Sequence, residues 1–177
     1  GLDTMTPLEI ATVMNREDEQ VVAGVRKVLP EVAAAGAGTA AFAVLFHVPA
    51  AFYLRCGVIG GCGWLCYRLL MAADLAAIPA VFCATVLVVF LSRLSAVVRR
   101  CPVTLFLVPG IFPLVPGVGI YWTAYYLVTD RSALASQQGS TTLRSAVAIV
   151  LGILLVLELP QGLFRRLAGP FLRASRQ

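Results

Sequence analysis

The sequence predicts an all-α integral membrane protein with about five transmembrane helices, the fourth of which is discontinuous. Its 177 residues are 59% hydrophobic and only 13% charged, with a mean hydropathy of +0.87, whereas soluble domains are closer to half apolar and a quarter charged. Apolar runs long enough for a membrane-spanning helix recur along the chain. One of these runs is rich in proline and glycine, which interrupt helices.

The positive charge of the chain indicates membrane orientation rather than nucleic-acid binding. The net charge of +5 is spread over short connections and is not gathered into one run. With five crossings, eight Lys and Arg residues fall on the side of the C-terminus and six on the side of the N-terminus. Because cytoplasmic loops carry the excess of positive charge, we expect a cytoplasmic C-terminus.

The first 29 residues are the only part with a soluble character. Valines recur at helical spacing in "VVAGVRKVL". Three interpretations remain open: an amphipathic helix on the membrane surface, a disordered tail, or a surface that binds a partner. We therefore divide the chain into an N-terminal polar or amphipathic segment (1–29), a transmembrane domain (30–164) and a basic C-terminal tail (165–177).

The first two predicted spans differ in their charge. Residues 32–50 carry no formal charge, whereas residues 51–72 contain Arg55 and Arg68. The twelve residues between these arginines cover only about 18 Å as a helix. Either the two side chains extend to opposite membrane faces or one of them points inward. Arg55 is therefore a candidate ligand for a substrate carboxylate.

Glycine spacing in the second span predicts close helix packing. Gly57 and Gly61 form a GxxxG pair, and small residues of this kind let two helix backbones approach each other. The neighbour is either a partner subunit or another span of the same chain.

Three further spans follow, at 75–91, 101–128 and 145–160. The second of these has no charge, and at about 1.5 Å per residue it is too long for one straight crossing. The last contains Glu158, the only acid within the apolar part of a predicted span. Ionisable groups in membranes are costly and often functional, so Glu158 is a candidate for proton coupling. The alternative is an interfacial residue at the end of a helix.

The stretch "FLVPGIFPLVPGVGIY" is the most informative part of the sequence. Pro109, Pro113 and Pro116 each remove a backbone donor and free a carbonyl four residues earlier. Gly110 and Gly117 permit conformations that do not continue a helix. Unsatisfied peptide groups do not persist against lipid. We therefore expect this backbone to face protein or a water-filled cavity, as do the interrupted helices of transporters; a kinked packing helix is the alternative.

The residues after the break suggest how cargo would bind. A half-helix that begins after Pro116 and Gly117 would direct its N–H groups at a carboxylate. Tyr121 and Thr123 supply hydroxyl groups close by. We expect these side chains, the proline–glycine backbone and Arg55 to form the substrate site.

No catalytic residue, metal site or cofactor is predicted. His47 is the only histidine and no CxxC motif occurs, which argues against a metal site. The sequence has neither a P-loop nor a nucleophile elbow. We therefore predict that the protein is not an enzyme.

Several of these stretches resemble the threonine/serine exporter family, and within it the small YjjB-like membrane subunits. The similarity covers roughly residues 33–160. It rests on "AAFAVLFHVPAAF", on "GVIGGCGWLCYRLL" and most strongly on "CPVTLFLVPGIFPLVPGVGIYWTAYYLV". Such subunits resemble the C-terminal half of fused exporters. The resemblance therefore implies a larger membrane subunit as an obligate partner, and serine, threonine or dicarboxylates such as succinate as cargo.

We therefore predict a subunit of a secondary exporter in a bacterial inner membrane, working by alternating access around the broken fourth helix. Assembly of the chain into a homo-oligomer is left open. The expected binding partners are bilayer lipid and a small-molecule substrate, and not nucleic acid. Two other functions remain open. One is a channel or pore subunit, and the other is a non-transporting scaffold for the larger subunit.

Overall fold

The computed structural model describes residues 7–160 together with 162 and 164, and within this part every regular element is a helix. The basic tail predicted at 165–177 lies outside the described residues. The elements are, in order, α1 (Pro7–Leu45), the 3-10 helix η1 (Ala50–Phe52), α2 (Tyr53–Ala72), α3 (Ala77–Arg99), α4 (Thr104–Ile111), the 3-10 helix η2 (Phe112–Leu114), α5 (Gly117–Val128) and α6 (Ser132–Leu157). The all-α prediction is confirmed.

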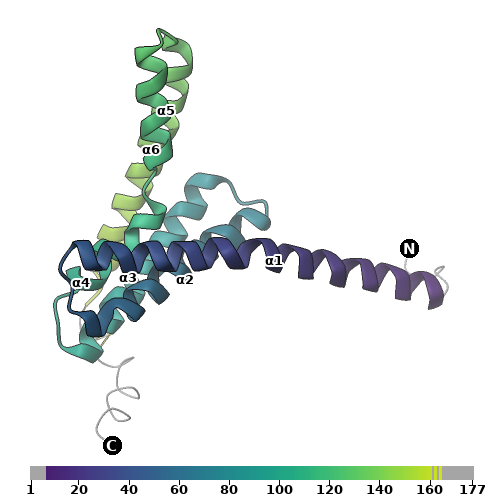
Figure 1. Ribbon diagram of the computed structural model, residues 1–177, viewed down its shortest axis with the longest axis horizontal. Helices are drawn as coiled ribbons and strands as arrows, with labels where there is room; N and C mark the ends of the chain where they lie inside the picture. The colour runs from purple at the N-terminus through teal and green to yellow at the C-terminus, as the bar shows by residue number, and fades with distance from the viewer. Residues whose placement is uncertain (1–6, 161, 163, 165–177) are drawn as a thin grey trace, which may run out of the picture.

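Helix α1 combines two segments that the sequence analysis separated. It runs without interruption from the polar N-terminal segment into the first predicted span and includes Pro30. The division at residue 30 is therefore not a break in the backbone. The part long and apolar enough to cross a membrane is Arg26–Leu45. The N-terminal part of α1 extends away from the rest of the molecule (Figure 1).

Four of the helices, α1, α2, α3 and α5, are followed by a residue with left-handed backbone conformation. His47, Asp74, Arg100 and Asp130 have φ values of 55°, 59°, 53° and 58°. Each follows the end of a long helix within a short connection. Aspartate, asparagine and histidine are the non-glycine residues enriched in this region. His47 is therefore explained as a helix-terminating residue of the connection between α1 and α2.

Fewer helices than expected have the length and apolar character of a membrane span. Three qualify, Arg26–Leu45, Ala77–Arg99 and Ser132–Leu157, and a fourth is added if the bent pair Thr104–Leu114 and Gly117–Val128 is one span. The expected span at 51–72 forms α2 but is not among these. The reason is its composition, because four glycines and two arginines lower its hydropathy.

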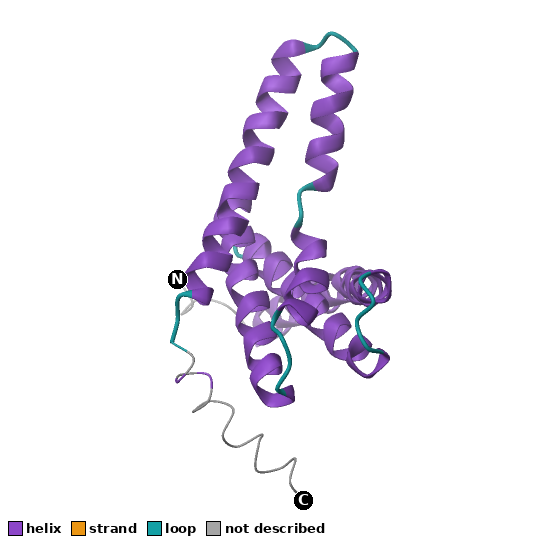
Figure 2. Ribbon diagram, turned by 90° about the vertical axis from the view of Figure 1, so that its left-hand side faces the viewer, coloured by secondary structure: helices purple, strands orange, loops and turns teal. Residues whose placement is uncertain are grey.

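The chain folds into a packed body and a projecting hairpin. Helices α1, α2, α3 and α4 pack together, each antiparallel to the next, and α6 continues parallel to α3. The first half of α6 extends past the start of α3 and pairs there with α5 (Figures 1 and 2). The hairpin of α5 and the first half of α6 thus stands apart from the body.

At most of the contacts between packed helices, a glycine of one helix lies against a β-branched side chain of the other. A Cβ atom added to the glycine would lie 2.0–2.9 Å from the nearest atom of its partner in four of these pairs. The four pairs are Gly60 with Thr39, Gly63 with Val88, Gly119 with Thr142 and Gly152 with Thr85. Such contacts bring helix backbones close together where no hydrophobic effect drives association.

Replacement of Gly60 by alanine should lower the melting temperature of the purified protein. The new Cβ would lie 2.0 Å from Thr39 Oγ1, which is held by a 2.8 Å hydrogen bond to the Ala35 carbonyl. Overpacking of this kind costs about 1–3 kcal/mol, more than the helix propensity of about 1 kcal/mol that alanine gains over glycine.

Gly38→Ala is the matched control, because nothing lies within 4 Å of its added Cβ. It should leave stability unchanged or raise it, and Gly60→Ala combined with Thr39→Ala should recover part of the loss. Equal melting temperatures for Gly38→Ala and Gly60→Ala would contradict this account of the interface.

Candidate functional site: the broken fourth helix

The proline–glycine stretch forms a bent pair of helices, as the sequence predicted. Thr104–Leu114 and Gly117–Val128 meet at an angle of 52°. The break lies at Val115, which has an extended backbone (φ −61°, ψ 129°), and at Pro116, which precedes α5. Both residues depart from helical geometry, so the break is a change of direction rather than a smooth curve.

The carbonyl that Pro109 frees is satisfied by another helix. Pro109 lacks the N–H that would bond the carbonyl of Leu105. The thiol of Cys56, at the start of α2, contacts that carbonyl oxygen at 3.5 Å and donates to it. A side chain on α2 thus replaces the missing helical hydrogen bond of α4.

The other two prolines are accommodated by local tightening of the chain. The carbonyl of Pro109, freed by Pro113, accepts from the N–H of Phe112. The carbonyl of Phe112, freed by Pro116, accepts from the N–H of Val115 at 3.2 Å. These bonds span three residues instead of four, the pattern of a 3-10 helix. The freed carbonyls are therefore satisfied within the protein.

The first half of the broken helix lies in the packed body. Phe106 and Pro109 are fully buried. A Cβ on Gly110 would lie 3.1 Å from Ile59 of α2 and 3.3 Å from Val88 of α3. The ring of Phe112 stacks on Phe42 of α1 with 3.7 Å between ring centroids. This half faces protein and leaves no space for a solute at Gly110.

The second half of the broken helix is open. Nothing lies within 4 Å of a Cβ added at Gly117. The N–H of Gly117 bonds the Val115 carbonyl at 2.8 Å, and that of Ile120 bonds the Pro116 carbonyl at 3.1 Å. The N–H groups of Val118 and Gly119 between them belong to the first turn, which has no acceptor within its own helix. The side chain of Tyr121 is 62% exposed. The start of α5 therefore presents polar groups on an accessible surface.

The residues proposed for substrate binding fall into separate places. Thr123 donates to the carbonyl of Gly119 at 2.7 Å and packs on Gly139 of α6, so its hydroxyl is engaged within the hairpin. Arg55 lies at the start of α2, which meets α4 near Leu105, at the opposite end of α4 from Gly117. Only Gly117 and Tyr121 remain together on an open surface.

An ion pair between α1 and α2 escaped the sequence analysis. Arg68 Nε lies 2.9 Å from Glu31 Oε2, and Trp64 Nε1 donates to the same oxygen at 3.3 Å. Each charged side chain is 39% exposed. Glu31 directly precedes the first predicted span, and Arg68 lies near the end of the second. Two consecutive antiparallel spans bring these two positions to the same end, so the sequence could have indicated the ion pair.

Arg93 of α3 holds the end of α6. Its Nη1 atom donates to the carbonyls of Leu157 (3.1 Å) and Leu159 (2.9 Å), and also to that of Val156. Val156 and Leu157 are the last two residues of α6, and Leu159 follows the helix; the Val156 carbonyl also accepts from the N–H of Leu159 at 3.2 Å. Glu158 lies in the same turn as the C-cap and is exposed. Arg93 was not among the site residues that the sequence predicted.

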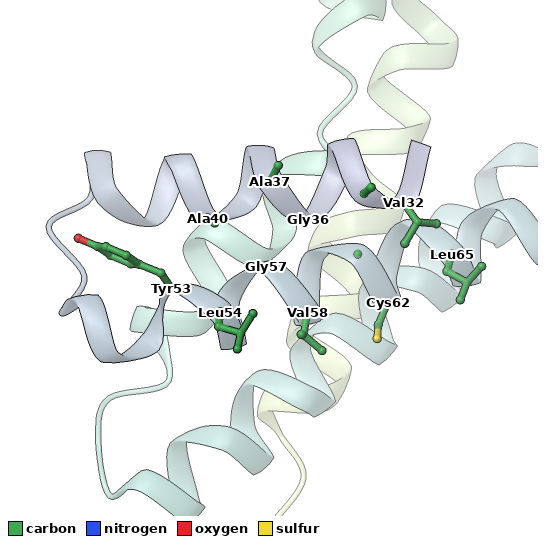
Figure 3. A pocket seen from close by; sticks show the side chains of 12 residues that line it. Val32, Gly36, Ala37, Ala40, Tyr53, Leu54, Gly57, Val58, Cys62 and Leu65 are labelled. Atoms are coloured by element: carbon green, nitrogen blue, oxygen red, sulfur yellow. The ribbon is translucent and has the colours of Figure 1, made fainter. Parts of the chain in front are cut away.

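An apolar groove of about 470 Å³ runs between α1 and α2 (Figure 3). At its base Gly57 and Gly36 are so close that a Cβ on either would lie 3.0–3.1 Å from the other's carbonyl oxygen. Gly61 lies against Val32. The neighbour of the GxxxG pair is therefore α1 of the same chain.

These features define an α-helical membrane protein built around an interrupted helix. The family model described as "Threonine/Serine exporter, ThrE" matches residues 31–158, most of the chain. The chain belongs to the threonine/serine exporter family, which consists of transporters. No curated protein and no solved structure gives a significant match.

Replacement of Cys56 by alanine should destabilise the protein through the carbonyl of Leu105. The loss should be about 1 kcal/mol, the net value of a typical hydrogen bond, and thermal unfolding in detergent would measure it. Cys56→Ser, which keeps a donor, should lose less.

The decisive comparison is the double variant. Pro109→Ala restores an N–H that bonds Leu105 from within α4, so Cys56→Ala should cost less in that background than in the parent protein. An equal cost in both backgrounds would mean that the thiol does not serve this carbonyl.

Proposed function

We propose that this chain is one subunit of a secondary exporter for small carboxylate-bearing metabolites, either serine and threonine or dicarboxylates such as succinate. The observation that carries the proposal is the 52° break in an apolar helix, in a chain of the threonine/serine exporter family. Interrupted helices at mid-membrane are the elements that secondary transporters use to bind cargo.

The proposed mechanism is alternating access with the break as the hinge. Helix α4 packs on α1, α2 and α3, whereas α5 packs chiefly on α6. The connection at Val115 and Pro116 joins these two units, and Gly117 has free space around it. A hinge needs a few residues that absorb a change in backbone angles while packed units move as rigid bodies. The hairpin would thus tilt against the body.

Cargo would bind at the start of α5. The first-turn N–H groups of Val118 and Gly119 carry the partial positive charge of a helix N-terminus, which favours a carboxylate. The exposed Tyr121 hydroxyl, one turn along the helix, would accept from an ammonium group or bond a hydroxyl of the cargo. This pairing suits an amino acid that carries both groups.

The larger subunit of the same exporter would cover the open face of α5. Val118 and Tyr121, which are 73% and 62% exposed, lie close to the first-turn N–H groups at the break, and Val128 at the far end of α5 is 87% exposed. Lipid could cover the apolar side chains, but it could not satisfy those N–H groups. A second membrane protein on this face would enclose the site, in the bacterial inner membrane with the C-terminus in the cytoplasm.

Stiffening the helices on the two sides of the break should slow export without preventing assembly. We expect Pro113→Ala combined with Gly117→Ala to reduce efflux of labelled serine, threonine or succinate about tenfold or more, equal to a barrier increase of about 1.4 kcal/mol. The measurement uses proteoliposomes that contain the chain alone and then the chain with the larger subunit. Pro79→Ala in the first turn of α3 is the matched control.

The same vesicles test the alternative functions. Counterflow and saturation support a carrier, whereas unsaturated electrodiffusion would identify a channel. Loss of co-purification with the larger subunit, rather than loss of efflux within an intact complex, would favour the scaffold.

Glu158→Gln tests the proposal that Glu158 couples export to protons. If it does, efflux driven by a pH gradient should fall to the rate measured without the gradient, while counterflow at equal pH continues. Glu31→Gln is the control, because Glu31 is paired with Arg68. An unchanged response of the Glu158→Gln variant to the gradient would remove Glu158 from the mechanism.

A further inference from the structure

A second cavity of about 470 Å³ lies where α3 ends, at the opposite end of α4 from the hinge. Its wall combines the last turns of α3, the connection to α4 and the end of α6. The residues that matter here are Arg93, Ala96, Cys101, Leu157 and Phe164. Cavities of this size accept small molecules.

Arg93 brings a positive charge to this cavity. Its Nη1 atom is occupied by the carbonyls at the end of α6, and the fully buried ring of Phe164 lies 4.5 Å below the guanidinium carbon. Within the described residues, the Nε and Nη2 atoms make no hydrogen bond, and no carboxylate lies within 4 Å of Arg93.

The Nε and Nη2 atoms of the guanidinium remain available to bind a carboxylate. Arginine binds a carboxylate through two parallel N–H donors, and here Nη1 is fixed in place while Nε and Nη2 are not used. A charge without a counter-ion in a partly buried, mostly apolar cavity is costly. A small oxyanion would satisfy the charge and both remaining donor atoms.

We propose that this cavity binds the carboxylate of the cargo through Arg93, as a second station near the membrane face that lies away from the hinge. The identification of the carboxylate as cargo rests on the proposed function, whereas the binding of a carboxylate does not. Phe164 and the carbonyls of α6 position the guanidinium, and Ala96 leaves the space that the ligand occupies.

Cys101 provides the test, because its thiol lines the same cavity. Burial raises the pKa of this thiol, and the nearby Arg55 and Arg99 only partly oppose the shift, so labelling accelerates as pH rises and is measured at fixed alkaline pH. The full chain, with Cys56 changed to serine and Cys62, Cys66 and Cys83 to alanine, is treated with a small thiol reagent in nanodiscs.

Serine and succinate should slow the labelling of Cys101, about tenfold at ten times the dissociation constant. Serinol, which replaces the carboxylate of serine with an alcohol, should not. Equal protection by serinol, or none by either carboxylate, overturns the proposal. The proposal is also overturned if the labelling rate of Cys101 changes only with the fraction of anionic phospholipid in the nanodisc, because the ligand would then be a lipid phosphate.

Two variants separate the ligand from the fold. Arg93→Gln should abolish protection, but it also releases the end of α6. Ala96→Leu therefore fills the cavity without changing Arg93 and should abolish protection. Because Ala96 is only 8% exposed, the melting temperature and the ligand-free labelling rate of this variant are measured beside those of the parent; Ala77→Leu at the exposed start of α3 is its control. Protection that survives Ala96→Leu contradicts the proposal. If efflux depends on Pro113 but neither carboxylate protects Cys101, the proposed carboxylate site is refuted while the proposed export function stands.

Discussion

The structure depends on one constraint: a backbone interrupted by proline inside an apolar environment must still pair its peptide groups. Pro109 leaves the Leu105 carbonyl without its helical donor, and Cys56 of α2 supplies the replacement. That contact brings the starts of α2 and α4 together, and Gly110 allows α4 to settle between Ile59 and Val88. The first half of the broken helix, α4, is thus firmly packed although it contains proline.

The same constraint divides the molecule into a stable and an adaptable part. In the body, glycines lie so close to threonine or valine that a Cβ would not fit, as at Gly63 against Val88, and such close contacts tolerate little displacement. The α5 hairpin touches the body mainly through α6, and next to its joint at Val115 and Pro116 nothing lies within 4 Å of a Cβ added at Gly117. The proposed alternating access needs both properties, because one unit must hold the pathway while another moves.

Arginine serves two different purposes at the two ends of the body. Arg68 is paired with Glu31 between α1 and α2, so its charge is compensated. Arg93 is held instead by neutral carbonyls and an aromatic ring, which orient the guanidinium without neutralising it. A charge that is positioned but not compensated is what an anion-binding site requires, and sequence position alone does not distinguish the two cases.

The sequence by itself determined the helical class, the membrane character, the interrupted fourth helix and the family, because hydropathy, proline and glycine act through local backbone chemistry. It also indicated close packing at Gly57, although not that Gly36 is the neighbour. Tertiary structure decided which groups meet: Cys56 and Leu105 lie 49 residues apart, and Arg93 and Val156 lie 63 apart. It also placed Arg55 and Tyr121 apart, although the sequence analysis had assigned both residues to one substrate site. Such pairings depend on which helix faces are adjacent after folding, and no local pattern encodes that choice.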